Sequence, residues 1–188
     1  MTGVIFDCKR FAVHDGEGLR TTLFLKGCPL RCPWCQNPEG LRREVQLWHR
    51  QSQCLQCGCC AQACKKDSIS MQPCPVIDRT RCDACGACVT ACPAAAMELC
   101  GKEISAEQAA ALLLRDRVFF GSQGGVTLSG GEALAQPEFA CEVLAGLAFG
   151  LKSGTDFTAG VSGVVFVHNV AERGRYIRSV PYRAGFLP

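Results

Sequence analysis

Eleven cysteines fall into three groups whose spacing suits metal binding. The groups are Cys28, Cys32 and Cys35; Cys54, Cys57, Cys60 and Cys64; and Cys82, Cys85, Cys88 and Cys92. The second and third groups share the spacing that binds [4Fe–4S] clusters in bacterial ferredoxins. The first group has three thiols and no obvious fourth, so a cluster there would leave one iron open to a small molecule. We therefore expect one catalytic cluster and two electron-carrying clusters, with all eleven cysteines as ligands.

Other uses of these cysteines fit the sequence less well. Structural zinc usually has four ligands, and the first group offers three. A disulfide scaffold is typical of secreted proteins, but residues 1–9 lack the apolar segment of a signal peptide. The sequence also has no run of about 18 apolar residues that could cross a membrane. We therefore expect a reducing, anaerobic, cytoplasmic setting and no membrane partner.

The second and third cysteine groups form an internal repeat, because Cys54 and Cys82 stand 28 positions apart. In two-cluster ferredoxins the fourth cysteine of each motif binds the other cluster. By that analogy we expect one cluster on Cys54, Cys57, Cys60 and Cys92, and another on Cys64, Cys82, Cys85 and Cys88. Such clusters could relay electrons. Alternatively, they could serve to hold a small unit folded, because cluster binding itself contributes folding free energy.

The elements expected around the first cysteine group are strands followed by loops. Strands are predicted at Val4–Phe6 and at Thr21–Lys26, with a glycine-punctuated loop at His14–Gly18 between them. The first cysteine group starts directly after the second strand. The carboxyl ends of strands are where α/β folds place their chemistry.

A second candidate site follows a later strand. Residues 124–129 read as a strand that runs into Gly130, Gly131 and Glu132. Two glycines allow the backbone to approach a ligand closely, and a neighbouring carboxylate can accept hydrogen bonds from an ammonium group. Taken alone, the same tripeptide could be a simple turn with a solvated glutamate.

Two helices and two small strands complete the expected layout. Ser105 is predicted to cap a helix, with Gln108 as its capping-box partner and an apolar face reaching about Val118. A second helix is expected from Pro137 through Leu147. Small hairpins are expected near Ser68–Met71 and Ala95–Leu99 within the cysteine-rich block. A strand is possible at residues 164–167.

Three runs, residues 10–22, 24–39 and 125–132, resemble the glycyl radical enzyme-activating enzymes, the pyruvate formate-lyase activase-like family of the radical S-adenosylmethionine (SAM) superfamily. Its subgroup with a two-cluster ferredoxin insert also matches residues 54–92. The resemblance implies an α/β fold: an incomplete radical-SAM (β/α) partial barrel with an inserted 2[4Fe–4S] ferredoxin-like domain. The implied domains are residues 1–49 and 101–148 for the barrel, 50–100 for the insert, and 149–188 as a divergent tail.

The same resemblance implies a cofactor, a reaction and partners. SAM would bind the open iron of the first cluster and be cleaved by one electron to a 5′-deoxyadenosyl radical, which takes a hydrogen from a glycine of a partner glycyl radical enzyme. Reduced flavodoxin or ferredoxin would supply the electron, and no general acid or base is assigned. The His14–Gly18 loop would lie near the cluster. The implied SAM contacts are Trp34, Cys35, Gln36, Gly130, Gly131 and Glu132.

Small departures from the family pattern accompany this resemblance, and none removes a cluster ligand. Glu17 and Ala133 stand where many relatives have proline, and Gln36 stands where histidine is common.

The tail after about residue 147 loses the family pattern. The formal net charge is +3, and residues 149–188 carry all of it, because they hold five basic and two acidic side chains. The rest of the chain is neutral, with no basic stripe that would favour nucleic acid. No later SAM-contacting motif follows. We therefore expect a truncated or frameshifted product with weak or no activity. The alternative function is an inactive fragment that retains ferredoxin-like electron-carrier capability.

Overall fold

The computed structural model describes residues 1–121, 123–152, 164–168 and 177–181. The chain forms two compact units, one made of residues 1–44 and 103–188, the other of residues 45–102. Each unit is described below by itself. None of the helices in the described ranges has the length and apolar character that crossing a membrane requires.

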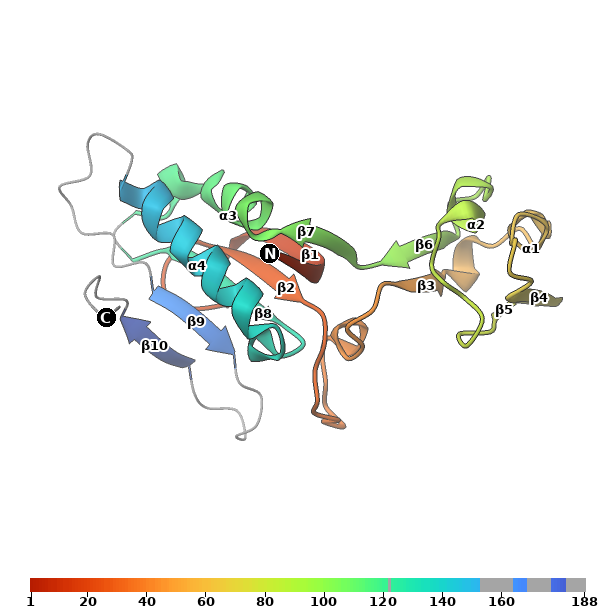
Figure 1. Cartoon of the computed structure of the whole chain (residues 1–188), viewed down its shortest axis with the longest axis horizontal. Helices are drawn as coiled ribbons and strands as arrows, with labels where there is room; N and C mark the ends of the chain where they lie inside the picture. Colours follow the sequence, from red (N-terminus) through yellow and green to blue (C-terminus); the bar gives the residue numbers. More distant parts are fainter. Residues whose placement is uncertain (122, 153–163, 169–176, 182–188) are drawn as a thin grey trace. The chain divides into compact units, whose positions relative to one another are not determined.

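The first unit is built on a six-stranded mixed sheet (Figure 1). The strands lie in the order β10-β9-β8-β2-β1-β7, and β2, β8 and β9 run parallel to one another. Strand β1 pairs antiparallel with β2, and β10 with β9. The strands are β1 (Thr2–Ala12), β2 (Arg20–Leu25), β7 (Lys102–Ser105), β8 (Gly125–Gly130), β9 (Val164–His168) and β10 (Ile177–Pro181).

Two helices cover one face of this sheet, α3 (Ala106–Leu114) and α4 (Pro137–Lys152) (Figure 1). Alternate residues of β2 and β8 point toward them, so Leu23 and Leu128 are buried against Leu113 and Val143 in one apolar core. Short 3-10 helices complete the unit: η1 (Pro38–Gly40), η3 (Arg117–Phe119) and η4 (Ala133–Ala135). The core thus fixes the two parallel strands whose carboxyl ends carry the candidate site.

Local signals in the sequence predicted most of these elements correctly. The strands at β1, β2, β8 and β9 and the start of α4 are confirmed. The Ser105 capping box is present, since Gln108 N–H donates to Ser105 Oγ and Ser105 N–H donates to the Gln108 side chain. The expectation that this helix reaches Val118 is wrong. It ends at Leu114, and Val118 lies in η3 with 72% of its surface exposed.

The tail contains one strand that the sequence did not predict. β10 extends the sheet beyond β9, which itself pairs with β8. Most of the tail's charged residues, among them Arg173, Arg175 and Arg183, lie outside the described residues.

The second unit consists of short elements around the two cysteine repeats. They are β3 (Gln46–His49), η2 (Gln51–Gln53), α1 (Cys59–Gln62), β4 (Ile69–Gln72), β5 (Cys74–Ile77), α2 (Ala87–Thr90) and β6 (Met97–Cys100). The predicted hairpin near Ser68–Met71 is confirmed as β4 paired with β5. The hairpin predicted at Ala95–Leu99 is wrong, because β6 pairs instead with β3, about 50 residues earlier.

The backbone of this unit repeats with the 28-residue period of its cysteines. Helices α1 and α2 each begin after a glycine with positive φ, Gly58 and Gly86. Gln56 and Ala84 have φ values of 55° and 54°, and Asp67 and Ala95 have 46° and 50°. Each pair is 28 positions apart. Left-handed backbone is uncommon outside glycine, so its recurrence shows that both halves adopt one loop geometry.

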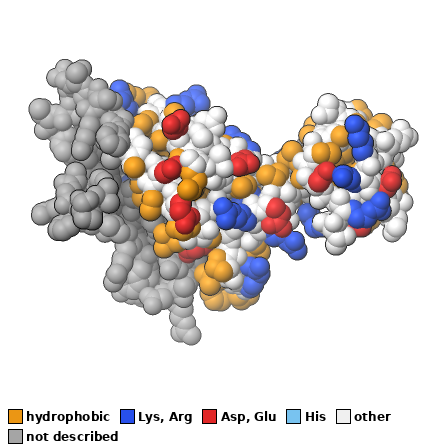
Figure 2. All heavy atoms as spheres, viewed as in Figure 1, with side chains coloured by type: hydrophobic (Ala, Val, Ile, Leu, Met, Phe, Trp, Pro, Cys, Tyr) orange, Lys and Arg blue, Asp and Glu red, His pale blue; other side chains and the backbone are white. Residues whose placement is uncertain are grey.

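The surface of the described residues mixes charges of both signs. On the face seen in Figure 2, Lys and Arg side chains are interspersed with Asp and Glu on both units. On this face, neither sign of charge forms a separate patch, in line with the neutral balance calculated for residues 1–148.

Candidate metal centres and cofactor site

The first cysteine group lies on a loop that leaves the carboxyl end of β2. The base of this loop is closed by two backbone hydrogen bonds, from Gly27 N–H to Gly40 O (2.7 Å) and from Cys28 N–H to Leu41 O (3.1 Å). Within the loop, Cys35 N–H donates to Cys32 O at 3.1 Å. The three thiols of the group are free and half-buried. The loop thus presents three sulfur ligands from a closed, anchored segment.

Lys26, the residue after β2, holds this loop in place by a hydrogen bond from its side chain. Its side chain is fully buried, and Nζ donates to the backbone oxygen of Glu39 at 2.6 Å. A buried ammonium is costly without strong acceptors, so this contact holds the far end of the loop against the end of the strand.

The Gly130-Gly131-Glu132 segment packs directly against the cysteine loop. Glu132 N–H donates to Gly27 O, and Gly131 N–H donates to Leu25 O, each at 2.8 Å. A Cβ atom on Gly131 would lie 2.5 Å from Gly40 O and 2.6 Å from Gly27 O. Gly130 has a φ of 105°, which favours glycine. The glycines are therefore required for this close approach, which places Glu132 beside the loop.

The remaining predicted SAM contacts differ in how they are held. The Glu132 carboxylate accepts a hydrogen bond from Leu134 N–H at 3.1 Å and so caps η4. This hydrogen bond orients the side chain and uses only one of its two carboxylate oxygens. Trp34 and Gln36 are exposed, with 64% of the Trp34 surface accessible. Their side chains are thus available for a ligand.

Gln136 is a positioning residue that sequence reasoning missed. It is 1% exposed, and its amide nitrogen donates to Val4 O and Lys26 O, each at 2.8 Å. Its amide oxygen accepts from Val4 N–H at 2.9 Å. One side chain therefore links β1, the end of β2 and the segment that follows Glu132. The sequence held no signal for this role beyond a lone polar residue before a helix.

The expectation that the His14–Gly18 loop lies near the first cluster is wrong. The loop precedes β2, whereas the cysteine loop follows it, so six strand residues separate them, or about 20 Å. There Asp15 accepts a hydrogen bond from Thr22 Oγ1 at 2.7 Å, and its backbone oxygen accepts from Thr127 Oγ1. Arg20, fully buried, donates to Thr127 Oγ1 at 2.7 Å. The loop is a structural cap on the opposite end of the sheet.

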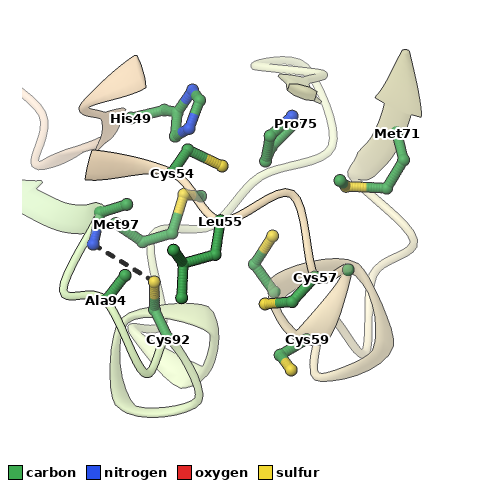
Figure 3. Close-up of a pocket in the computed structure, with 13 residues that line it drawn as sticks. His49, Cys54, Leu55, Cys57, Cys59, Met71, Pro75, Cys92, Ala94 and Met97 are labelled. Atoms are coloured by element: carbon green, nitrogen blue, oxygen red, sulfur yellow. Dashed lines mark hydrogen bonds between the residues drawn. The ribbon is translucent and has the colours of Figure 1, made fainter. Parts of the chain in front are cut away.

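In the second unit, five cysteines from distant positions line one hollow (Figure 3). Four of them are Cys54, Cys57, Cys60 and Cys92, the set that the ferredoxin analogy assigned to one cluster. The fifth is Cys59, which stands between two of these cysteines in the sequence and is not a predicted ligand. His49, Met71 and Met97 also line the hollow, which no sequence pattern predicted.

The other four thiols form a second neighbourhood around Cys88. Burial and, to a smaller extent, nearby Cys82, Cys64 and Cys85 together raise the pKa of the Cys88 thiol to about 11. Cys88 and Cys60 are both buried in the apolar core of the unit, which Cys64, Cys82 and Cys92 contact. A metal cluster must displace these thiol protons, so ligand binding here is linked to proton release.

Several cysteine sulfurs already accept hydrogen bonds from the protein. Ser68 N–H donates to Cys64 Sγ at 3.3 Å, and Ala96 N–H donates to Cys92 Sγ at 3.2 Å. The Ser68 hydroxyl also lies 3.1 Å from Cys64 Sγ and lowers the pKa of that thiol. Hydrogen bonds of this kind hold cluster ligands and tune cluster potentials.

These features test whether the residues of the second unit fit iron–sulfur clusters. The paired left-handed residues curl each loop, a geometry that turns successive N–H groups toward a bound anion in many Fe–S sites. Within the described residues, no three His, Cys, Asp or Glu side chains converge as ligands of a single metal ion. A four-iron cluster needs wider spacing, because its ligands bind different irons. The donors present are cysteine thiols, which are the usual ligands of such clusters.

Comparison with known proteins bears on both units. Residues 75–98, which hold the third cysteine group, match the model of the 4Fe-4S binding domain. The chain is 49% identical over 148 residues to a (2S)-3-sulfopropanediol sulfolyase activating enzyme of Bilophila wadsworthia, covering 76% of this chain and 49% of the relative.

Two further relatives act on different partners. A (2S)-3-sulfopropanediol dehydratase activating enzyme of Klebsiella oxytoca is 42% identical over 148 residues, which is 75% of this chain and 47% of the relative. Pyruvate formate-lyase 2-activating enzyme of Escherichia coli is 39% identical over 141 residues, or 74% and 40%. The chain thus spans about half the length of the relatives it matches. Over the part that aligns, the chain is similar to activating enzymes of glycyl radical enzymes, and it carries an iron–sulfur domain.

Proposed function

We propose that this chain carries the cluster-binding and part of the SAM-binding machinery of a glycyl radical enzyme activase. The observation that supports this most strongly is the contact between the cysteine loop and the Gly-Gly-Glu segment. Glu132 N–H donates to the backbone oxygen of Gly27, the residue directly before Cys28. This hydrogen bond therefore joins the residue proposed to bind SAM to the loop proposed to bind the cluster. In the family, these two segments serve one cofactor.

In this proposal the residues of the chain position the cluster and SAM and shield them from solvent. Cys28, Cys32 and Cys35 would bind three irons of a [4Fe–4S] cluster, whose chemistry when bound is the one-electron cleavage of SAM at its open iron. Glu132, held by its cap on η4, would accept hydrogen bonds from the SAM amino group. Gly130 and Gly131 allow this backbone segment to lie close to the cysteine loop and to the cofactor. Trp34 and Gln36 would cover the cofactor from the exposed side of the loop.

The second unit would hold two further [4Fe–4S] clusters, for a total of three. We propose Cys54, Cys57, Cys60 and Cys92 for one and Cys64, Cys82, Cys85 and Cys88 for the other. The two neighbourhoods of thiols described above support this assignment. The clusters would relay electrons from reduced flavodoxin or ferredoxin toward the first cluster.

The partner would be a glycyl radical enzyme, whose backbone glycine loses a hydrogen. The named partners of the relatives include a sulfolyase, a dehydratase and a formate-lyase. We infer a member of this group of lyases and dehydratases, since the chain aligns with activases of all three.

A second candidate function is that of an electron carrier alone. Residues 45–102 form a compact unit with its own apolar core around Cys60 and Cys88. In this alternative only the two ferredoxin-type clusters would assemble, and SAM would have no effect on them.

Anaerobic reconstitution of the chain with iron and sulfide distinguishes the two candidates. The activase proposal expects about twelve irons per chain, four for each of three clusters, and an electron paramagnetic resonance (EPR) signal that changes on addition of SAM. The control is the triple variant Cys28→Ala, Cys32→Ala, Cys35→Ala, which should lose about four irons and the response to SAM. If the unaltered chain binds about eight irons and ignores SAM, the electron-carrier function stands instead.

A further inference from the structure

The two halves of the second unit are near copies of each other, which makes their differences informative. Strand β3 pairs with β6 as β5 pairs with β4, and His49 opposite Met97 corresponds to Ile77 opposite Ile69. Each corresponding pair is 28 positions apart. At the position where one half has an isoleucine, the other half therefore has an imidazole.

The imidazole of His49 is a buried polar group in this unit for which the protein supplies no hydrogen-bond partner. Among the side chains that the structure describes, His49 Nε2 is the one buried nitrogen or oxygen without a hydrogen-bond partner. A buried polar group without a partner is destabilising unless a partner is supplied. Its repeat counterpart shows that the fold accepts an apolar side chain at this position, so packing alone does not require a histidine.

His49 also lies where a partner would be supplied. It lines the same hollow as the four thiols of the proposed first ferredoxin-type cluster and lies beside Cys54 at its edge (Figure 3). The other residues at this edge are apolar, such as Met97 and Pro75, or cysteines. Apart from His49, no side chain in this lining carries an oxygen or nitrogen, so a group that fills the hollow would supply an acceptor to the buried Nε2–H.

We propose that His49 donates a hydrogen bond from Nε2–H to a sulfur of the cluster bound by Cys54, Cys57, Cys60 and Cys92, and so raises the reduction potential of that cluster. This inference rests on the proposed two-cluster unit. Reduction adds one negative charge to the cluster, so a donor to its sulfurs stabilises the reduced form more than the oxidised form. His49 is thus a positioning and tuning residue, and it takes no part in the transfer of atoms.

The other cluster has a tuning group of its own. The Ser68 hydroxyl contacts Cys64 Sγ at 3.1 Å, whereas the corresponding position in the repeat is Ala96, which has no hydroxyl. Ser68 and His49 are therefore polar side chains, one near each proposed cluster, whose repeat counterparts Ala96 and Ile77 carry no donor. Ser68→Ala is the matched control, because it removes a donor from the second cluster and leaves the first untouched.

The test uses the full chain with Cys28, Cys32 and Cys35 replaced by alanine, so that only the two ferredoxin-type clusters contribute. Midpoint potentials are measured by EPR-monitored redox titration, and iron is counted in every sample. In His49→Ile, which copies the repeat counterpart, we expect the reduced-to-oxidised ratio of one cluster at a fixed potential to fall about tenfold, a shift of about 59 mV for one electron. His49→Gln keeps an N–H donor, so the midpoint potential of that cluster should stay close to its value with His49 in place.

The outcomes separate this inference from the assignment on which it rests. A shift of one cluster in His49→Ile and of the other in Ser68→Ala supports it. Unchanged midpoints in His49→Ile with about eight irons retained would overturn it, and so would a shift of the same cluster in both variants. If the background chain binds fewer than about eight irons before His49 is altered, the two-cluster assignment itself fails and the inference fails with it.

Discussion

Gly131 offers the sharpest test of the joint between the cysteine loop and the Gly-Gly-Glu segment. In Gly131→Ala the new Cβ would stand 2.5 Å from Gly40 O and 2.6 Å from Gly27 O, both backbone atoms that cannot rotate away. Forcing extra atoms into a packed region costs about 1–3 kcal/mol. The segment must move off the loop, so the Glu132 N–H to Gly27 O bond lengthens as well. We expect a loss of about 2 kcal/mol in unfolding free energy.

Urea denaturation of the reconstituted chain measures this loss. With a dependence of about 2 kcal/mol per molar urea, the midpoint should fall by about 1 M. The response of the EPR signal to SAM should weaken in parallel, because Glu132 is displaced. The control is Gly125→Ala on the same strand, whose Cβ would meet only Arg20 nitrogens at an ordinary 3.6 Å. Equal midpoints and SAM responses in the two variants would refute the close-packing argument.

Three further predictions concern single side chains. Gln136→Leu leaves Val4 N–H and Lys26 O without the Gln136 partner, while Val4 O keeps Lys26 N–H, and should cost about 2–4 kcal/mol of unfolding free energy, read as a lower urea midpoint; an unchanged midpoint would contradict the positioning role. Ser105→Ala removes the capping box and should cost about 1 kcal/mol, seen as a lower thermal midpoint; no change would mean that the cap is redundant. Hydrogen bonds from Arg10 hold the pKa of Asp116 below its usual range, so this stabilisation is present at neutral pH and is lost as pH falls from about 4 through the folded-state pKa. In Asp116→Asn, the thermal midpoint should therefore be lower than in the unaltered chain at pH 7, and the gap should narrow below pH 4; a gap independent of pH would contradict the ion-pair explanation.

Features written in short stretches of sequence could be predicted correctly. The Ser105 and Gln108 pair set the start of α3, because a capping box involves only neighbouring residues. The cysteine spacing within each group predicted the 28-residue repeat, which the backbone angles of Gln56 and Ala84 reproduce. β2 and β8 could each be predicted as buried apolar strands, since each signal is local to its strand.

Features that depend on distant partners could not be predicted. β6 pairs with β3 across the whole second unit, and the β6 sequence alone does not favour that partner over a hairpin. Gln136 gains its role only because Val4 and Lys26 are brought beside it by the fold. His49 could not be singled out from the sequence, because its counterpart Ile77 becomes evident only when β3 is aligned with β5. The ligand roles of the cysteines stay a prediction.

The pairing of β3 with β6 brings the entry and exit of the second unit together. Gln46 lies opposite Cys100, and paired Cα atoms in an antiparallel ladder are about 5 Å apart. A chain segment of more than fifty residues thus begins and ends at nearly one point. A linker of a few residues could span that distance, so the cysteine repeats could be removed from the chain without straining the remaining backbone. For the same reason, they could be inserted into a loop of another protein. The second unit, to which we assign the proposed electron-carrying clusters, is therefore separable from the rest of the chain by design.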